Sequence, residues 1–257
     1  MNALELHNVS VQYGAFTAVN AASLIVPAGG SAAIVGESGS GKSTIARAVM
    51  GLQRLASGTI TIEGSPLRTR RSARSRRDSG IQMIFQDPIS SLNPRRRLLD
   101  IVTEPLVLRR RGDRASQRAR GAELLERVGL DPARYGDLRA GQISGGQAQR
   151  VAIARALAAE PRILVCDEPV SALDVSVQAT VLNLFAELRE HEGLTLLFIS
   201  HDLAVVRMIA DHCHVMRSGE IVESGDTEDI LRTPQHPYTQ QLIRAAPQIA
   251  ALTSGAS

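Results

Sequence analysis

The chain has 257 residues, of which 44% are hydrophobic and 21% are charged. These values are typical of a globular protein and exclude a disordered chain, a collagen and a coiled coil. No stretch reaches the roughly 18 apolar residues that a membrane span requires, and MNALELHNVS lacks the regions of a secretory signal. We therefore expect neither an integral membrane protein nor a secreted one. Cys166 and Cys213 are too few for a disulfide framework, which favours a reducing compartment.

The net charge is only +3, but the positive charge is concentrated in one part of the sequence. Residues 68–120 hold fifteen arginines and five acids, a balance of +10, whereas the rest of the chain carries −7. This block predicts either a solvated surface or a face toward an anionic partner. Aromatic residues make up 3% of the chain and Trp is absent, which argues against base stacking on nucleic acid.

The first expected elements are strands. Residues 4–11 alternate apolar and polar side chains, and residues 23–30 predict a second strand that ends in a Pro/Gly turn. Residues 32–35 form a short apolar run that predicts a third strand. A Gly/Ser loop follows, and then a helix with apolar residues at helical spacing: Ile45, Val49 and Leu52. This order of strand, glycine loop and helix is the context that a phosphate-binding loop requires.

The loop sequence, residues 36–43, matches the pattern G-x-x-x-x-G-K-[ST] in full, and we call it the phosphate loop. Its glycines let backbone N–H groups point inward around an anion, and the following helix adds its positive N-terminal end. Lys42 is predicted to reach the β- and γ-phosphates, and the Ser43 hydroxyl to ligate Mg²⁺. Lys42 is also the only lysine among 29 basic residues, which suggests that its position requires a compact ammonium group. The predicted phosphate contacts are Gly36, Glu37, Ser38, Gly39, Ser40, Gly41, Lys42, Ser43 and Thr44.

Two further apolar runs end in polar residues. Residues 162–167 predict a central strand beside the phosphate-loop strand, which would place Asp167 near the Mg²⁺. Glu168 can then accept a proton from the attacking water. Residues 194–200 predict another buried strand, with His201 at its end. Ligands of open α/β sheets gather at the carboxyl ends of strands, so His201 is predicted to donate a hydrogen bond to the γ-phosphate.

Between these runs lies the signature segment, residues 144–147 (SGGQ), which precedes an apolar helix. Ser144 is a natural N-cap, and the Gly145-Gly146 pair allows close backbone approach to an anion. The segment is therefore either a second phosphate clamp or an ordinary capped helix start.

Taken together, these motifs resemble the ATP-binding-cassette (ABC) ATPases over nearly the whole chain. The phosphate loop, IFQDP, ISGGQ, ILVCDEP, SALD and His201 occur in that family's order. The resemblance implies that Tyr13 stacks on adenine, that Gln86 senses Mg²⁺ and couples to a membrane partner, and that Asp174 lies at a dimer interface. It further implies that the signature segment, Ser144, Gly145, Gly146 and Gln147, closes on the ATP of the opposite subunit. The implied catalytic set is Glu168, His201, Lys42 and Gln86, and the implied Mg²⁺ set is Ser43, Gln86 and, through water, Asp167.

The resemblance also implies the architecture. The fold class is α/β, a P-loop NTPase with a RecA-like core, an N-terminal antiparallel β subdomain and an α-helical subdomain. We expect one nucleotide-binding domain over residues 1–257. Residues 1–86 and 143–232 form the core with the β subdomain, 87–142 the helical subdomain, and 233–257 a C-terminal extension. Residues 98–130 agree, because DIVTEPLVLRR and RARGAELLERVGL are amphipathic helical patterns without a strand signal.

Two stretches, residues 87–106 and 233–247, resemble the oligopeptide, dipeptide and nickel importer ATPases. This implies the ATP-hydrolysing subunit of an importer for peptides or nickel, peripheral at the cytoplasmic face of the bacterial inner membrane. The implied partners are two transmembrane permease subunits, a substrate-binding protein and a second ATPase subunit, identical or paralogous, in a head-to-tail dimer; nucleic acid is not expected. The alternative is a soluble ABC-type ATPase without a transmembrane partner, such as a component of a phosphonate-cleaving complex, whose relatives share the HPYTQ-like ending.

Overall fold

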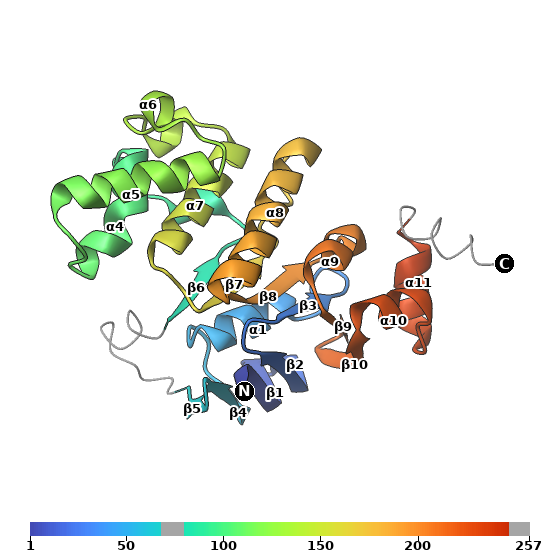
Figure 1. Ribbon diagram of the computed structural model, residues 1–257. Helices are drawn as coiled ribbons and strands as arrows, with labels where there is room; N and C mark the ends of the chain where they lie inside the picture. Colours follow the sequence, from blue (N-terminus) through green and yellow to red (C-terminus); the bar gives the residue numbers. More distant parts are fainter. Residues whose placement is uncertain (68–79, 247–257) are drawn as a thin grey trace. The chain divides into compact units, whose positions relative to one another are not determined.

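The computed structural model describes residues 1–67 and 80–246 (Figure 1). The first part of the arginine-rich block and the end of the chain therefore lie outside the described residues. The chain divides into two compact units. The first unit comprises residues 1–72, 165–167 and 193–257, and the second unit comprises residues 73–164 and 168–192.

The first unit contains a four-stranded antiparallel sheet with the order β2-β1-β4-β5. Its strands are β1 (Asn2–Tyr13), β2 (Phe16–Pro27), β4 (Ser57–Ile62) and β5 (Ser65–Pro66). The predicted strand at 4–11 is confirmed within β1, whose Leu4 and Leu6 are fully buried. The second strand begins seven residues before the predicted position 23. Its first half pairs irregularly with β1 and contains Ala21 at a φ of 48°, so it lacks a regular alternation of apolar residues.

A second sheet carries the phosphate loop. In the first unit its order is β10-β9-β3-β8, followed by the last residues of β7. The prediction that the strand ending at Asp167 lies beside the phosphate-loop strand was wrong, because β8 lies between them. The strands are β3 (Ser31–Val35), β7 (Ile163–Asp167), β8 (Thr195–Ser200), β9 (His212–Arg217) and β10 (Glu220–Asp226). β3 runs parallel to both neighbours, with Val35 opposite Ser200 on one side and Val215 on the other. Every residue of β3 is buried, as expected for a central parallel strand. The residues that follow β3 and β8 therefore lie at the same edge of the sheet.

The helices of the first unit are α1 (Lys42–Val49), α9 (Leu203–Ile209), α10 (Thr227–Arg232) and α11 (Pro237–Arg244). The helix predicted after the phosphate loop is confirmed, but the prediction that it includes Leu52 was wrong. α1 ends at Val49, and Leu52 lies outside it with 52% of its surface exposed. The cause is Gly51, whose left-handed backbone, with a φ of 66°, does not continue a helix.

The second unit is mainly helical (Figure 1). Its elements are β6 (Ile81–Ile84), α3 (Pro88–Ser91), α4 (Leu98–Leu108), α5 (Arg114–Arg127), α6 (Pro132–Tyr135), η1 (Ala140–Gln142), α7 (Gly145–Ala158) and α8 (Val175–Glu192). The two helices predicted within residues 98–130 are confirmed as α4 and α5, with shifted ends. α5 begins earlier because Asp113 caps it by accepting a hydrogen bond from the Ser116 N–H at 2.8 Å. The unit extends beyond the predicted insert at 87–142, because α7 packs on α4 and α5.

The cysteines are free and fully buried in central strands, Cys166 in β7 and Cys213 in β9. Burial raises the pKa of both thiols, to about 12 at Cys213. Among the helices within residues 1–67 and 80–246, none combines the length and apolar character that crossing a membrane demands.

Candidate functional site

The phosphate loop connects β3 to α1, and its glycines adopt conformations that other residues rarely reach. Gly36, Gly39 and Gly41 have φ angles of 150°, 80° and 108°. A Cβ on Gly36 would lie 2.1 Å from the Met216 carbonyl oxygen, and one on Gly41 would lie 2.5 Å from the carbonyl oxygen of Ala18. The loop is therefore pressed against neighbouring backbone, and glycine is required at both places.

Lys42 is the first residue of α1, and its side chain folds back onto the loop. The ammonium donates to the carbonyl oxygens of Gly36 and Glu37, at 2.8 Å and 2.7 Å. Lys42 is only 6% exposed, so the charge is held inside the loop. A compact ammonium on a flexible stem fits this setting better than a planar guanidinium does.

Asp167, at the end of the apolar strand β7, contacts the phosphate loop directly. Asp167 is the last residue of β7 and is 3% exposed. It accepts a hydrogen bond from the Ser43 hydroxyl at 2.9 Å, across 124 residues of sequence. A hydroxyl and a carboxylate are hard oxygen ligands of the kind that Mg²⁺ prefers, so this pair fits a magnesium site.

His201 follows β8, the neighbour of β3. Since Ser200 lies opposite Val35 in the parallel pair, His201 leaves the sheet at the edge where the phosphate loop begins. Its side chain is exposed, and the next residue, Asp202, caps α9 by accepting from the Ala204 N–H at 2.8 Å. The phosphate loop, Asp167 and His201 are thus gathered at one sheet edge.

In the second unit, Gln86 and Glu168 are in contact. The Gln86 amide donates to the Glu168 carboxylate at 3.1 Å. Glu168 has a φ of 49°, a left-handed conformation that costs a residue with a side chain about 1–2 kcal/mol. Its carbonyl oxygen accepts from the Ser171 hydroxyl at 3.0 Å, which helps to hold the turn. Strained backbone of this kind concentrates at functional sites.

The signature segment forms a capped helix start. The Ser144 hydroxyl accepts from the Gln147 N–H at 3.2 Å, and the Gln147 side-chain oxygen accepts from the Ser144 N–H at 2.9 Å. This reciprocal pair is a capping box, so the predicted N-cap is confirmed. A Cβ on Gly146 would lie 3.3 Å from the Ala172 carbonyl oxygen, whereas one on Gly145 would meet no described atom within 4 Å. The backbone at Gly145 is therefore open to a close approach from outside.

Asp174 follows the signature segment in sequence and caps α8. Its carboxylate accepts from the Ser176 hydroxyl at 2.7 Å and from the Val177 N–H at 3.0 Å. These two hydrogen bonds lower the pKa of Asp174, so the residue is an anion at neutral pH. The structure thus gives Asp174 a local role in starting α8, in addition to any role between subunits.

Tyr13 ends β1 at a tight hairpin, where it pairs with Phe16 across Gly14. Tyr13 is 44% exposed and Phe16 is 65% exposed, so the hairpin offers two aromatic faces. Tyr13 was predicted to contact the nucleotide and Phe16 was not, although the two aromatic residues flank the glycine turn in YGAF.

A second residue outside the predicted set also reaches the site. The Tyr238 hydroxyl, in α11, accepts a hydrogen bond from the Glu37 N–H at 3.1 Å. The two residues are 201 positions apart, and no local pattern signals the contact.

Comparison with known proteins gives consistent results. Residues 19–171 match the family described as ABC transporter, and residues 222–255 match the one described as oligopeptide/dipeptide transporter, C-terminal region. The chain is 47% identical over 240 residues to the oligopeptide transport ATP-binding protein OppD of Mycobacterium tuberculosis, covering 91% of this chain and 38% of that protein. It is 46% identical over 235 residues to OppF of Lactococcus lactis subsp. lactis, also an oligopeptide transport ATP-binding protein, covering 90% and 73%. The chain therefore spans less than half the length of the mycobacterial relative.

A solved structure supports the same fold. It is described as the dimeric structure of a post-hydrolysis state of an ATP-binding cassette bound to ADP and Pi. The TM-score is 0.80 and the sequence identity 30%, and the match covers 87% of this chain and 98% of that one. This similarity confirms the fold class predicted from the sequence.

Proposed function

The chain belongs to the ABC transporter family, and on that basis we propose that it is the ATP-hydrolysing subunit of a bacterial importer for peptides. The match to the C-terminal region of oligopeptide and dipeptide transporters supports this branch. It favours an importer over a cassette ATPase without a membrane partner, and the relatives named for oligopeptide transport favour peptides over nickel.

The first step is binding of the nucleotide phosphates. The phosphate loop presents backbone N–H groups to an anion, and the Lys42 ammonium adds a positive charge at its centre. His201 stands at the same sheet edge and can donate to the terminal phosphate. Tyr13 supplies an exposed ring for the adenine base.

Ser43 and Asp167 are the residues of this chain that would hold Mg²⁺. The family resemblance is the basis for proposing Gln86 as a further oxygen ligand. Mg²⁺ supplies positive charge that neutralises the phosphate oxygens during phosphoryl transfer. The buried Asp167 carboxylate fixes the Ser43 hydroxyl in place, so this oxygen pair is already oriented by the fold.

Glu168 is proposed as the general base that accepts the proton of the attacking water. Its carboxylate accepts a hydrogen bond from the Gln86 amide, so a movement of Gln86 would change the position of the base. Gln86 directly precedes Asp87, which caps the short helix α3, where Ile89 is exposed. We propose that this stretch transmits the state of the site to a permease subunit at the cytoplasmic membrane face.

The signature segment and Asp174 belong to the second unit, whereas the phosphate loop belongs to the first. We propose that two ATPase subunits, identical or paralogous, associate head to tail so that each signature segment completes the other's nucleotide site. The dimeric cassette with ADP and Pi supports this arrangement. The proposed partners are two permease subunits and a substrate-binding protein.

The observation that carries the proposal is the Ser43–Asp167 hydrogen bond, because it joins two distant motifs into one phosphate and metal site. The test is Glu168→Gln, which removes the carboxylate but keeps the shape of the side chain. Hydrolysis should fall by about 10²–10⁴-fold while ATP binding is retained. With ATP and Mg²⁺, the variant should sediment as a dimer, alone or with its paralogous partner.

The matched control is Glu190→Gln, the same chemical change on an exposed position of α8. Its turnover should equal that of the unchanged protein. Turnover of Glu168→Gln within about threefold of the control would reject Glu168 as the base. A protein that neither binds nor hydrolyses ATP would reject the proposed function altogether.

A further inference from the structure

The C-terminal segment, residues 233–246, touches the phosphate loop through one side chain. Tyr238 is 3% exposed, and its hydroxyl oxygen lies 3.1 Å from the backbone nitrogen of Glu37. Glu37 is the second residue of the phosphate loop, and its own side chain is exposed. The contact is therefore made to the loop's backbone and does not depend on the glutamate side chain.

The hydrogen bond completes a clamp on a single peptide unit. The N–H of Glu37 and the C=O of Gly36 belong to the same planar peptide group. The N–H donates to Tyr238, and the C=O accepts from the Lys42 ammonium at 2.8 Å. A planar group held at both ends cannot rotate without breaking one bond. Tyr238 and Lys42 thus bind opposite ends of one peptide group.

The tyrosine is itself fixed by the sheet that carries the phosphate loop. The Arg217 guanidinium lies over its ring, 4.9 Å from the centroid, an arrangement that is electrostatically attractive. Arg217 ends β9, and β9 pairs with β3 directly before the loop. The ring and the loop are therefore positioned by neighbouring strands of one sheet.

The residues just before Tyr238 are anchored to β10. The Glu223 carboxylate accepts from the backbone N–H of Gln235 at 2.7 Å and of His236 at 3.1 Å. The His236 ring nitrogen in turn accepts from the Tyr238 N–H at 3.2 Å and starts α11. These bonds fix the backbone from which the tyrosine ring projects.

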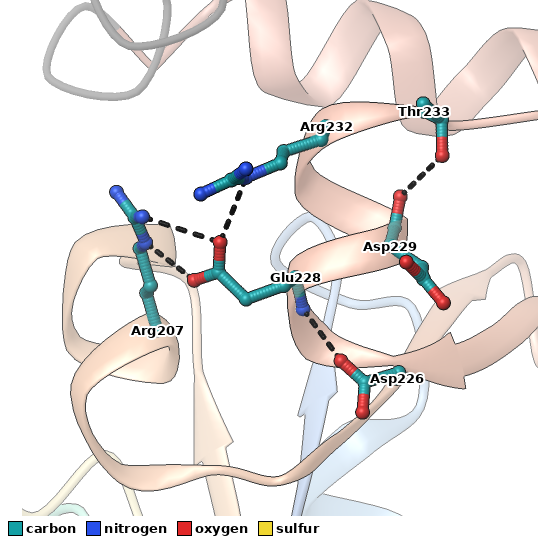
Figure 2. A network of polar contacts seen from close by, with 6 residues as sticks. All are labelled: Arg207, Asp226, Glu228, Asp229, Arg232 and Thr233. Carbon is teal, nitrogen blue, oxygen red and sulfur yellow. Dashed lines mark hydrogen bonds and ion pairs between the residues drawn. The ribbon is translucent and has the colours of Figure 1, made fainter.

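A second anchor lies further upstream, in α10 (Figure 2). The Arg207 guanidinium makes two hydrogen bonds to the Glu228 carboxylate, at 2.6 Å and 3.2 Å, and Arg232 adds a third at 3.0 Å. Because Arg207 belongs to α9, this network ties the helix that leads into the C-terminal segment to the first unit's core.

We propose that Tyr238 is a positioning residue of the nucleotide site, which orients the Gly36–Glu37 peptide and through it Lys42, so that nucleotide affinity depends on docking of the C-terminal segment. This inference rests on the proposed ATP-binding function. The C-terminal segment, which contains none of the nucleotide-binding motifs, would then influence nucleotide affinity through the phosphate loop. It does not require Tyr238 to touch the nucleotide.

The test is Tyr238→Phe in the full chain, which deletes one hydroxyl and keeps the ring beneath Arg217. Loss of one hydrogen bond that orients the loop should weaken binding of a fluorescent ATP analogue about five- to tenfold in the presence of Mg²⁺. KM for ATP should rise by a similar factor, with kcat at saturating ATP unchanged, because ground-state and transition-state binding are lost equally. Without nucleotide, hydrogen exchange at the Glu37 amide should accelerate by a similar factor.

The matched control is Thr233→Val, which deletes a hydroxyl of the same segment that donates to the Asp229 carbonyl oxygen and contacts neither the loop nor Glu223. It should leave ATP affinity and Glu37 exchange within twofold of the unchanged protein, whatever its melting temperature. Equal effects of the two variants would overturn the proposal and leave the proposed function standing. An unchanged protein that binds no ATP would instead remove the proposed function, and the positioning role with it.

Discussion

Gly36 offers a sharp test of how the phosphate loop is built. In Gly36→Ala the new Cβ would lie 2.1 Å from the Met216 carbonyl oxygen, against about 3.4 Å for an ordinary contact. The loop and β9 would have to separate by roughly 1.3 Å, directly after the Val35–Val215 pair. Overpacking and backbone strain each cost about 1–3 kcal/mol, so the free energy of unfolding should fall by about 3 kcal/mol.

The matched control is Gly39→Ala in the same loop. Gly39 also has a positive φ, 80°, but a Cβ there meets no described atom within 4 Å. The control therefore isolates backbone strain without a collision, and it should cost only about 1 kcal/mol. The difference between the two variants measures how tightly the loop is pressed against β9.

Two assays read out this difference. Urea unfolding gives the free energy of unfolding, and titration with a fluorescent ATP analogue gives the affinity. A displacement of more than 1 Å should weaken binding by about 100-fold in Gly36→Ala, well beyond the effect in the control. Two variants with unfolding free energies within about 0.5 kcal/mol of each other, and with similar affinities, would refute the reasoning.

Lys42→Arg should lower both ATP affinity and turnover by at least about tenfold, because a planar guanidinium cannot replace the ammonium that donates to two loop carbonyls. Unchanged ATP affinity in a binding assay together with unchanged turnover in a phosphate-release assay would contradict this. His214 predicts a pH dependence. Burial, with a smaller effect of His212, lowers its pKa from 6.5 to about 4, so the unfolded chain binds the proton first as pH falls. The free energy of unfolding should therefore drop by on the order of 3 kcal/mol between pH 7 and pH 4, and His214→Leu should remove that part of the slope in urea unfolding at both pH values.

Much of the first unit's sheet was predictable because its signals are local. The apolar runs of β3, β7 and β8 are continuous, and their ends agree with the prediction to within about a residue. The end of α1 was missed because helical spacing favoured Leu52, although Gly51 already marked the stop. Capping residues such as Asp113 were equally visible in the sequence and more informative about helix ends than apolar spacing.

In the candidate site, too, the contacts between residues of known motifs were predictable and the others were not. Ser43 and Asp167 could be paired in advance because each belongs to a motif with known chemistry. The contact between Glu37 and Tyr238 could not, because it joins a backbone amide to a residue 201 positions away. The left-handed backbone of Glu168 could not be predicted either, because a glutamate in the sequence gives no indication of a positive φ.

The two buried thiols make this chain convenient for labelling experiments. Thiolates, not thiols, react with maleimides, and burial both raises the pKa of Cys166 and Cys213 and shields their sulfur atoms. A single cysteine introduced on the surface should therefore be modified selectively in the folded protein, with both native cysteines left in place. Fluorophores or spin labels placed this way would follow the proposed association of two subunits in real time.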